Sequence, residues 1–153
     1  MKLYFCLFYL FISGSLCAEE GQIVTITTAT QQHDFVVEIA STPKQQERGL
    51  MLRKYLRHNH GMLFLYAQPQ IARFWMKNTY IPLDLIFIDA QDKIIQIYEN
   101  AQPLSQKLIC SQKPIKAVLE LFSGSVARYN IKINQAIKIS SNKDKHERAT
   151  NHY

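Results

Sequence analysis

A short stretch of the chain concentrates side chains that could bind a ligand. It combines the only tryptophan, Trp75, with the polar residues 77–79, and a carboxylate follows at Asp84. An aromatic ring can stack on one face of a small ligand while cations, amides and carboxylates bind its polar groups. The candidate ligand-binding residues are Arg53, Trp75, Lys77, Asn78, Thr79, Asp84 and Glu120. This set predicts a site for a small anionic or sugar-like ligand.

The same residues also have a purely structural interpretation. Lys77 could pair with Asp84 while Asn78 and Thr79 form a turn, because buried polar groups are usually satisfied within the protein. Asp84 follows a proline and begins a strongly apolar segment. A carboxylate at such a position commonly accepts hydrogen bonds from backbone N–H groups. We therefore expect Asp84 to have a structural role and Lys77 a binding role.

Two further chemistries stay open. Asp84 and Glu120, on separate predicted strands, could act as an acid–base pair in a glycan- or ester-acting enzyme. Met51, Met62 and Met76 could bind copper(I), although methionines more often fill gaps in a core. The spacing of His58 and His60 is not a zinc pattern. The sequence shows no complete catalytic set, so no cofactor and no metal are predicted and catalysis is left undecided.

The first residues have the order of a secretory signal peptide. Lys2 precedes an apolar run from Leu3 to Ile12, and small residues lead to Ala18 before the acidic Glu19. The apolar run is shorter than the roughly 20 residues needed to span a bilayer. Cleavage after Ala18 would leave 135 residues (153 − 18), which is one domain by length. The sequence thus predicts an exported protein, periplasmic or secreted.

The expected export bears on the partners of this basic chain and on the state of its cysteines. Loss of Lys2 lowers the formal net charge from +6 to +5, and a basic domain favours anionic partners, an anionic membrane surface included. Nucleic acid is excluded because the chain is expected outside the cytoplasm and has no nucleic-acid motif. Cys110 is the one cysteine left after cleavage, so no internal disulfide forms, and we expect Cys110 to be buried. The chain is expected to be a monomer.

The pattern along the rest of the chain is mostly that of short strands. Strands are predicted over residues 22–30, 35–39, 62–66, 72–76, 83–89, 93–99, 117–121 and 136–140. Thr42, Pro43 and Gln45 have the pattern of a capping box with proline at the first helical position. A second short helix is predicted over residues 124–129, a long loop over 102–113, and a polar disordered tail over 141–153. The fold class is therefore mostly β (α+β), a sandwich or barrel with one or two short helices.

These motifs together resemble an uncharacterised family known as domain of unknown function 192. The resemblance rests on Gly-Leu-Met-x-Arg at residues 49–53, Gly-Met-Leu-Phe at 61–64, Phe-Trp-Met-Lys-Asn-Thr at 74–79, Pro-Leu-Asp at 82–84 and Leu-Glu-Leu at 119–121. It covers about residues 23–139. It implies a compact jelly-roll-like β domain, over residues 22–140, that is often exported, and it implies no established activity.

The chain departs from the family pattern before its last strand. Members usually have a Gly-Asp turn there, whereas this chain has Asn134 and Gln135. The substitution predicts a looser terminal turn and leaves the central motifs unchanged.

Overall fold

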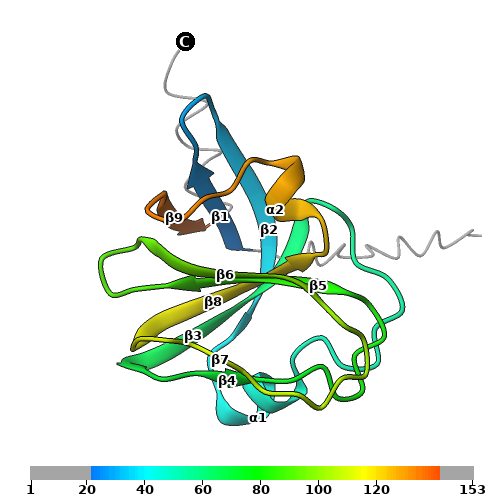
Figure 1. Cartoon of the computed structure of the whole chain (residues 1–153). Coiled ribbons are helices and arrows are strands. Elements are labelled where there is room, and N and C mark those ends of the chain that lie inside the picture. Colours follow the sequence, from blue (N-terminus) through cyan, green and yellow to red (C-terminus); the bar gives the residue numbers. More distant parts are fainter. Residues whose placement is uncertain (1–21, 142–153) are drawn as a thin grey trace, which may run out of the picture.

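In a computed structural model, residues 22–141 are described, and they form nine strands and two short helices (Figure 1). The expected signal peptide and all but Ser141 of the expected tail lie outside the described residues. The elements are β1 (Gln22–Thr27), β2 (Gln32–Ala40), α1 (Pro43–Arg48), β3 (His60–Gln70), β4 (Arg73–Phe74), β5 (Leu83–Ile88), β6 (Ile94–Ala101), β7 (Ile109–Cys110), β8 (Ile115–Phe122), α2 (Ser125–Arg128) and β9 (Ala136–Ser141).

Seven strands form one curled sheet in the order β6-β5-β8-β3-β2-β1-β9, and β4 pairs with β7 in a small second sheet. Neighbours are antiparallel except β2 and β3, which are parallel. The sheet curls until its edge strands approach each other, and a bridge between Lys93 and Ala136 joins the starts of β6 and β9. Figure 1 shows β9 and β1 inclined over the layer formed by β6, β5, β8 and β3. The predicted mostly β fold is confirmed, in the form of a nearly closed, curled sheet.

Apolar side chains pack on both faces of this sheet. One cluster, with Val24, Phe35 and Ile86 at its centre, fills the concave side of the curl. The other, with Phe64 and Phe87, lies on the opposite face, where the loops after α1 and the β4–β7 pair cover it. Because β5 is covered on both faces, all six of its residues are buried.

Several boundaries differ from the predictions. Residues 32–34 belong to β2 because they pair with β1, so the first hairpin turn lies before Gln32. The predicted long loop contains the two-residue strand β7. Cys110 is exposed, so the expectation of a buried thiol is wrong. In β7 the neighbouring Ile109 is the buried residue, and successive strand residues point to opposite sides.

Hydrogen bonds fix the start of α1 and the turn before β9. Thr42 caps α1, and its hydroxyl accepts from the Gln45 N–H while the Gln45 side chain accepts from the Thr42 N–H, which confirms the capping box. Before β9, Asn134 has φ 71°, a left-handed conformation that asparagine tolerates. The Asn134 N–H donates to the Ile94 carbonyl at 2.8 Å, so the turn predicted to be loose is instead anchored to β6.

Within residues 22–141, no helix has the length and apolar character that crossing a membrane would require.

Candidate functional site

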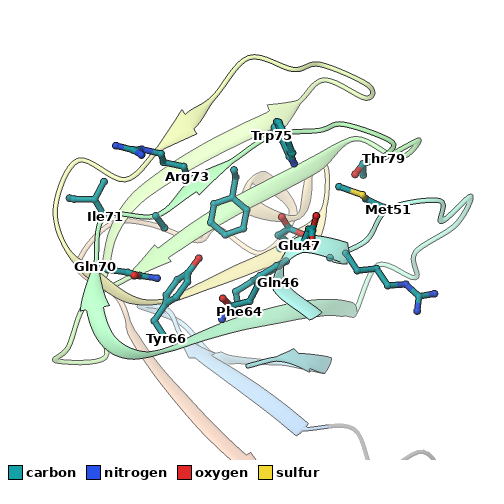
Figure 2. A pocket seen from close by; sticks show the side chains of 15 residues that line it. Gln46, Glu47, Met51, Phe64, Tyr66, Gln70, Ile71, Arg73, Trp75 and Thr79 are labelled. Carbon is teal, nitrogen blue, oxygen red and sulfur yellow. The ribbon is translucent and has the colours of Figure 1, made fainter. Parts of the chain in front are cut away.

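A cavity of about 370 Å³ lies between α1, β3 and the segment around β4. Its walls carry four aromatic side chains, Phe64, Tyr66, Phe74 and Trp75, and the buried carboxyl group of Glu120 lies at its base. Figure 2 shows the Tyr66 hydroxyl pointing into the cavity, with Glu47 of α1 on the other side and Trp75 above. The volume falls within the range of small-molecule sites.

Hydrogen bonds hold α1 against the sheet and so form one wall. The side-chain amide of Gln46 donates to the carbonyl of Leu65 at 2.8 Å and to that of Ala40 at 3.3 Å. These two bonds hold α1 against both β2 and β3. Since α1 is only six residues long, its position depends on these contacts and on its cap rather than on helix propensity.

Gly49 ends α1 at the edge of the cavity. It has φ 45°, a backbone conformation that favours glycine. A Cβ atom placed there would lie 3.2 Å from the ring of Phe64. Gly49 therefore lets the chain turn closely over this ring and leaves the cavity open on that side.

The β4–β7 pair forms the opposite wall. Ala72 and Ser111 are joined twice, because the Ala72 N–H donates to the Ser111 hydroxyl at 2.9 Å and the Ser111 N–H donates to the Ala72 carbonyl at 3.0 Å. Phe74 of β4 is buried and packs edge-on against Phe64, with ring centroids 5.0 Å apart. This packing leaves the next residue, Trp75, 43% exposed and facing the cavity.

Glu120 is placed by strand pairing. On β8 it lies opposite Met62 of β3 and Leu85 of β5, so its side chain shares their apolar face. It is only 5% exposed, and no hydrogen bond or ion pair within residues 22–141 reaches its carboxyl group. Burial raises the pKa of Glu120 to about 8. The carboxyl group can therefore hold a proton at neutral pH.

Tyr66 lies near this carboxyl group, whose charge affects the pKa of the Tyr66 hydroxyl. Burial, and then the charge of Glu120, raise the pKa of the Tyr66 hydroxyl to about 12. The phenol therefore stays protonated and offers one donor and one acceptor inside the cavity. Tyr66 and Glu120 do not bond to each other, which leaves both groups available to a third group between them.

The structure brings together three of the seven residues predicted for the site. Trp75, Thr79 and Glu120 line the cavity, although Thr79 is 5% exposed and its hydroxyl donates to the Lys77 carbonyl at 3.4 Å. The other four residues lie elsewhere for identifiable reasons.

Arg53 forms an ion pair with Glu38 and lines a different hollow, between β2 and the loop before β3. Lys77 is exposed, and its ammonium lies 5.1 Å from the centre of the Trp75 ring, a cation–π contact. The structural alternative, an ion pair between Lys77 and Asp84, is absent among the residues that the structure describes. Asn78 has φ 56° and is a turn residue whose carbonyl accepts from the Leu52 N–H at 2.8 Å.

Asp84 is fully buried on the other face of the sheet. Its two carboxylate oxygens accept from the backbone N–H groups of Asn100, at 2.9 Å, and Val126, at 3.0 Å. In the pairing of β5 with β8, Asp84 lies opposite Leu121 and Leu85 opposite Glu120. Asp84 and Glu120 therefore point to opposite faces, and the expectation that they form an acid–base pair is wrong.

The methionines do not share one environment. Met62 and Met76 are buried in the apolar cluster around Phe64, as expected for side chains that fill a core. Met51 is half-buried and lines the cavity. Within residues 22–141, no group of three or more histidine, cysteine, aspartate or glutamate residues is arranged to hold a metal ion.

Sequence reasoning missed several cavity residues. Tyr66 was predicted only as part of a strand, Phe64 as part of that strand and of a family motif, and Glu47 was given no role. The alternation of β3 gave one usable signal, because residues 62, 64 and 66 share a face with Glu120. No local signal places α1 beside this face, since that contact depends on the packing of distant segments.

The fold and the site together define a small, mostly β domain with a cavity lined by aromatic side chains and by the carboxyl group of Glu120. The chain belongs to the DUF192 family, described as "Uncharacterized ACR", whose model matches residues 24–139.

The chain is similar to several solved structures. A protein from Sinorhizobium meliloti described as a "putative transcription regulator" is 39% identical, with a TM-score of 0.76, over 78% of this chain and 95% of that one. A protein of unknown function from Novosphingobium aromaticivorans is 39% identical, with a TM-score of 0.74, over 76% of this chain and 83% of that one. None of the curated proteins matches the chain.

Proposed function

We propose that the protein is a small exported binding or accessory module that holds a small, sugar-like ligand in the cavity above Glu120. One observation supports this most directly: a carboxyl group that is 5% exposed has no partner within residues 22–141 and faces a cavity of about 370 Å³. Buried polar groups are normally hydrogen-bonded, so a group left free in a cavity is suited to a ligand. Aromatic walls with a few polar groups are typical of such sites.

The cavity narrows the class of ligand. The sequence predicted an anionic or a sugar-like ligand, and an anion would meet the carboxyl group of Glu120 at the base and that of Glu47 on α1. Glu47 is exposed, and Glu120 adds a negative charge when it ionises, so both side chains disfavour an anion. A ligand with hydroxyl or amine donors and an apolar ring face suits these surroundings better. We therefore keep the sugar-like class and set the anionic class aside.

Binding can be tested with a variant that removes one polar atom. Tyr66→Phe is expected to weaken ligands found in a screen of small saccharides and ring alcohols about 5- to 10-fold, the effect of one lost hydrogen bond. Titration calorimetry measures the affinity, and fluorescence of the sole tryptophan, Trp75, reports binding beside it. Tyr98→Phe is the matched control, because Tyr98 is exposed on β6 and does not line the cavity. Equal affinities in the two variants, or the absence of any ligand, would count against the proposal.

A second candidate function follows from the raised pKa of Glu120. A carboxyl group that keeps its proton near neutral pH can act as a general acid, and Glu47 supplies a second carboxylate at the same cavity. The second candidate is therefore a glycan- or ester-acting enzyme in which Glu47, instead of Asp84, is the second carboxylate of the acid–base pair. Hydrolysis of chromogenic glycosides or esters that Glu120→Gln abolishes would favour catalysis over binding alone.

Export is part of the proposal and rests on residues 1–18. We expect the protein recovered after export to begin at or near Glu19, because the short apolar run and the small residues before it fit signal cleavage. Intact mass spectrometry of that material measures the first residue directly. A processed species that keeps residues 1–18 would contradict the signal peptide. The control is the same gene without codons 2–18, whose product should stay in the cytoplasm.

A further inference from the structure

The carboxyl group of Glu120 has no positively charged partner within residues 22–141. Two ion pairs are found within residues 22–141, Arg53 with Glu38 and Lys116 with Asp92, and neither involves the cavity. Glu120 therefore has no cation beside it, although it is 5% exposed. An ionised carboxylate in such a place is costly unless a cation or hydrogen-bond donors accompany it.

The protein's own cations are not placed to supply this charge. Arg48 and Arg73 line the cavity but are exposed, and Figure 2 shows the Arg73 guanidinium pointing away from it. Lys77 lies over the ring of Trp75. Glu47 adds a second negative charge to the cavity wall. The ionised form of Glu120 is therefore best balanced by a cation that a ligand supplies.

The walls are suited to a cation. Phe64, Tyr66, Phe74 and Trp75 surround the space above Glu120, and the faces of aromatic rings attract cations, most strongly where water is excluded. The Tyr66 hydroxyl oxygen and the Glu120 carboxylate are both free to accept hydrogen bonds. Two acceptors among aromatic side chains match an ammonium group, which has three donors and a positive charge.

We infer that the ligand of this cavity carries a protonated primary amine, which donates to Glu120 and Tyr66, on a ring-sized body that packs against Trp75. This inference rests on the proposed function and specifies the ligand class for the same cavity. The volume of about 370 Å³ exceeds what an ammonium group fills, so the remaining space takes the apolar body. An amino sugar or another compact cyclic amine has this chemistry.

The ionisation of Glu120 gives the inference a distinctive pH dependence. An amine requires the carboxylate form, and the pKa of Glu120 is about 8 in the free protein. Affinity for an amine should therefore rise as pH increases toward 8, by up to about tenfold per pH unit. The other ionisable groups that line the cavity are Tyr66 of β3, Glu47 and Arg48 of α1, and Arg73 of β4.

The test compares two probes of the same size, cyclohexylamine and cyclohexanol. Calorimetry and Trp75 fluorescence near pH 8 should show the amine binding about 10- to 100-fold more tightly than the alcohol, the effect of a charged hydrogen-bonded pair. Glu120→Gln keeps the shape of the side chain and should remove this preference. Glu99→Gln makes the same change at an exposed position of β6 outside the cavity and should leave the preference intact. Urea unfolding confirms that both variants are folded.

The outcomes separate this inference from the proposed function. If the alcohol binds as tightly as the amine, or if Glu120→Gln keeps the preference, the amine is wrong while the cavity is still a binding site. If neither probe binds and the saccharide screen also finds no ligand sensitive to Tyr66→Phe, both proposals fail. An affinity for the amine that stays constant between about pH 6 and pH 8.5 would also overturn the inference.

Discussion

Replacing Asp84 with alanine is expected to lower the free energy of unfolding by about 3–5 kcal/mol. Asp84 is completely buried, and its two oxygens accept from the N–H groups of Asn100 and Val126. Removing the carboxylate leaves both donors without this acceptor, and the bond at the start of α2, from Val126, is buried. Each hydrogen bond to a charged group contributes about 1.5–3 kcal/mol, so the two together account for the expected loss. Urea unfolding followed by circular dichroism measures it.

Two variants act as controls for this loss. Asp84→Asn keeps one acceptor oxygen and should cost about half as much, because one donor still has a partner. Lys77→Ala should change stability by less than about 1 kcal/mol, since Lys77 is exposed and its ammonium lies over the Trp75 ring. If Lys77→Ala and Asp84→Ala proved equally destabilising, the structural role given to Asp84 would be wrong.

The stability of the unliganded protein is expected to fall by up to about 5 kcal/mol between about pH 4.5 and pH 8 through Glu120 alone. The pKa of Glu120 is raised from 4.5 to about 8 on folding, so over this window the folded state holds a proton that the unfolded state has released. The unfolded state therefore binds fewer protons, and the free energy of unfolding decreases as pH rises. Below the lower pKa the Glu120 contribution is constant, and above the higher one the full loss is reached.

The difference between wild type and Glu120→Gln isolates this effect. Glutamine has nearly the same shape and no charge, so the variant should lose most of the pH dependence and be more stable than wild type above about pH 8. The ionisable groups other than Glu120 are the same in both proteins, so their effects cancel in the difference. Urea unfolding of both proteins at about pH 5 and pH 8.5 measures the four free energies of unfolding that are compared. Parallel stability curves for the two proteins would show that the Glu120 carboxyl group is not desolvated as described.

Asp84 and Glu120 have different roles although their strands pair with each other. Asp84 and Glu120 lie on the neighbouring strands β5 and β8, yet Asp84 is satisfied by backbone donors whereas Glu120 is left without a partner. A residue that is satisfied internally contributes to stability. The charged form of Glu120 lacks a protein partner and lowers stability, and this cost is consistent with a binding role.

Local features of the fold could be predicted because their causes are local. The cap of α1 depends on Thr42 and Gln45, which are three residues apart. The exposure of Cys110 was mispredicted because it depends on which side of β7 faces the sheet. That orientation is set by the pairing of Arg73 with Cys110, across a long separation in sequence.

By itself, the sequence determined the mostly β class, the family, and the presence of Trp75, Thr79 and Glu120 among the candidate residues. Only the tertiary structure decided that these three meet at one cavity, that Asp84 lies on the opposite face, and that Arg53 pairs with Glu38. The physical reason is that residue type and periodicity follow from neighbours along the chain. Which polar groups converge, and which of them find partners, follows from strand order and from the packing of α1 against β2 and β3.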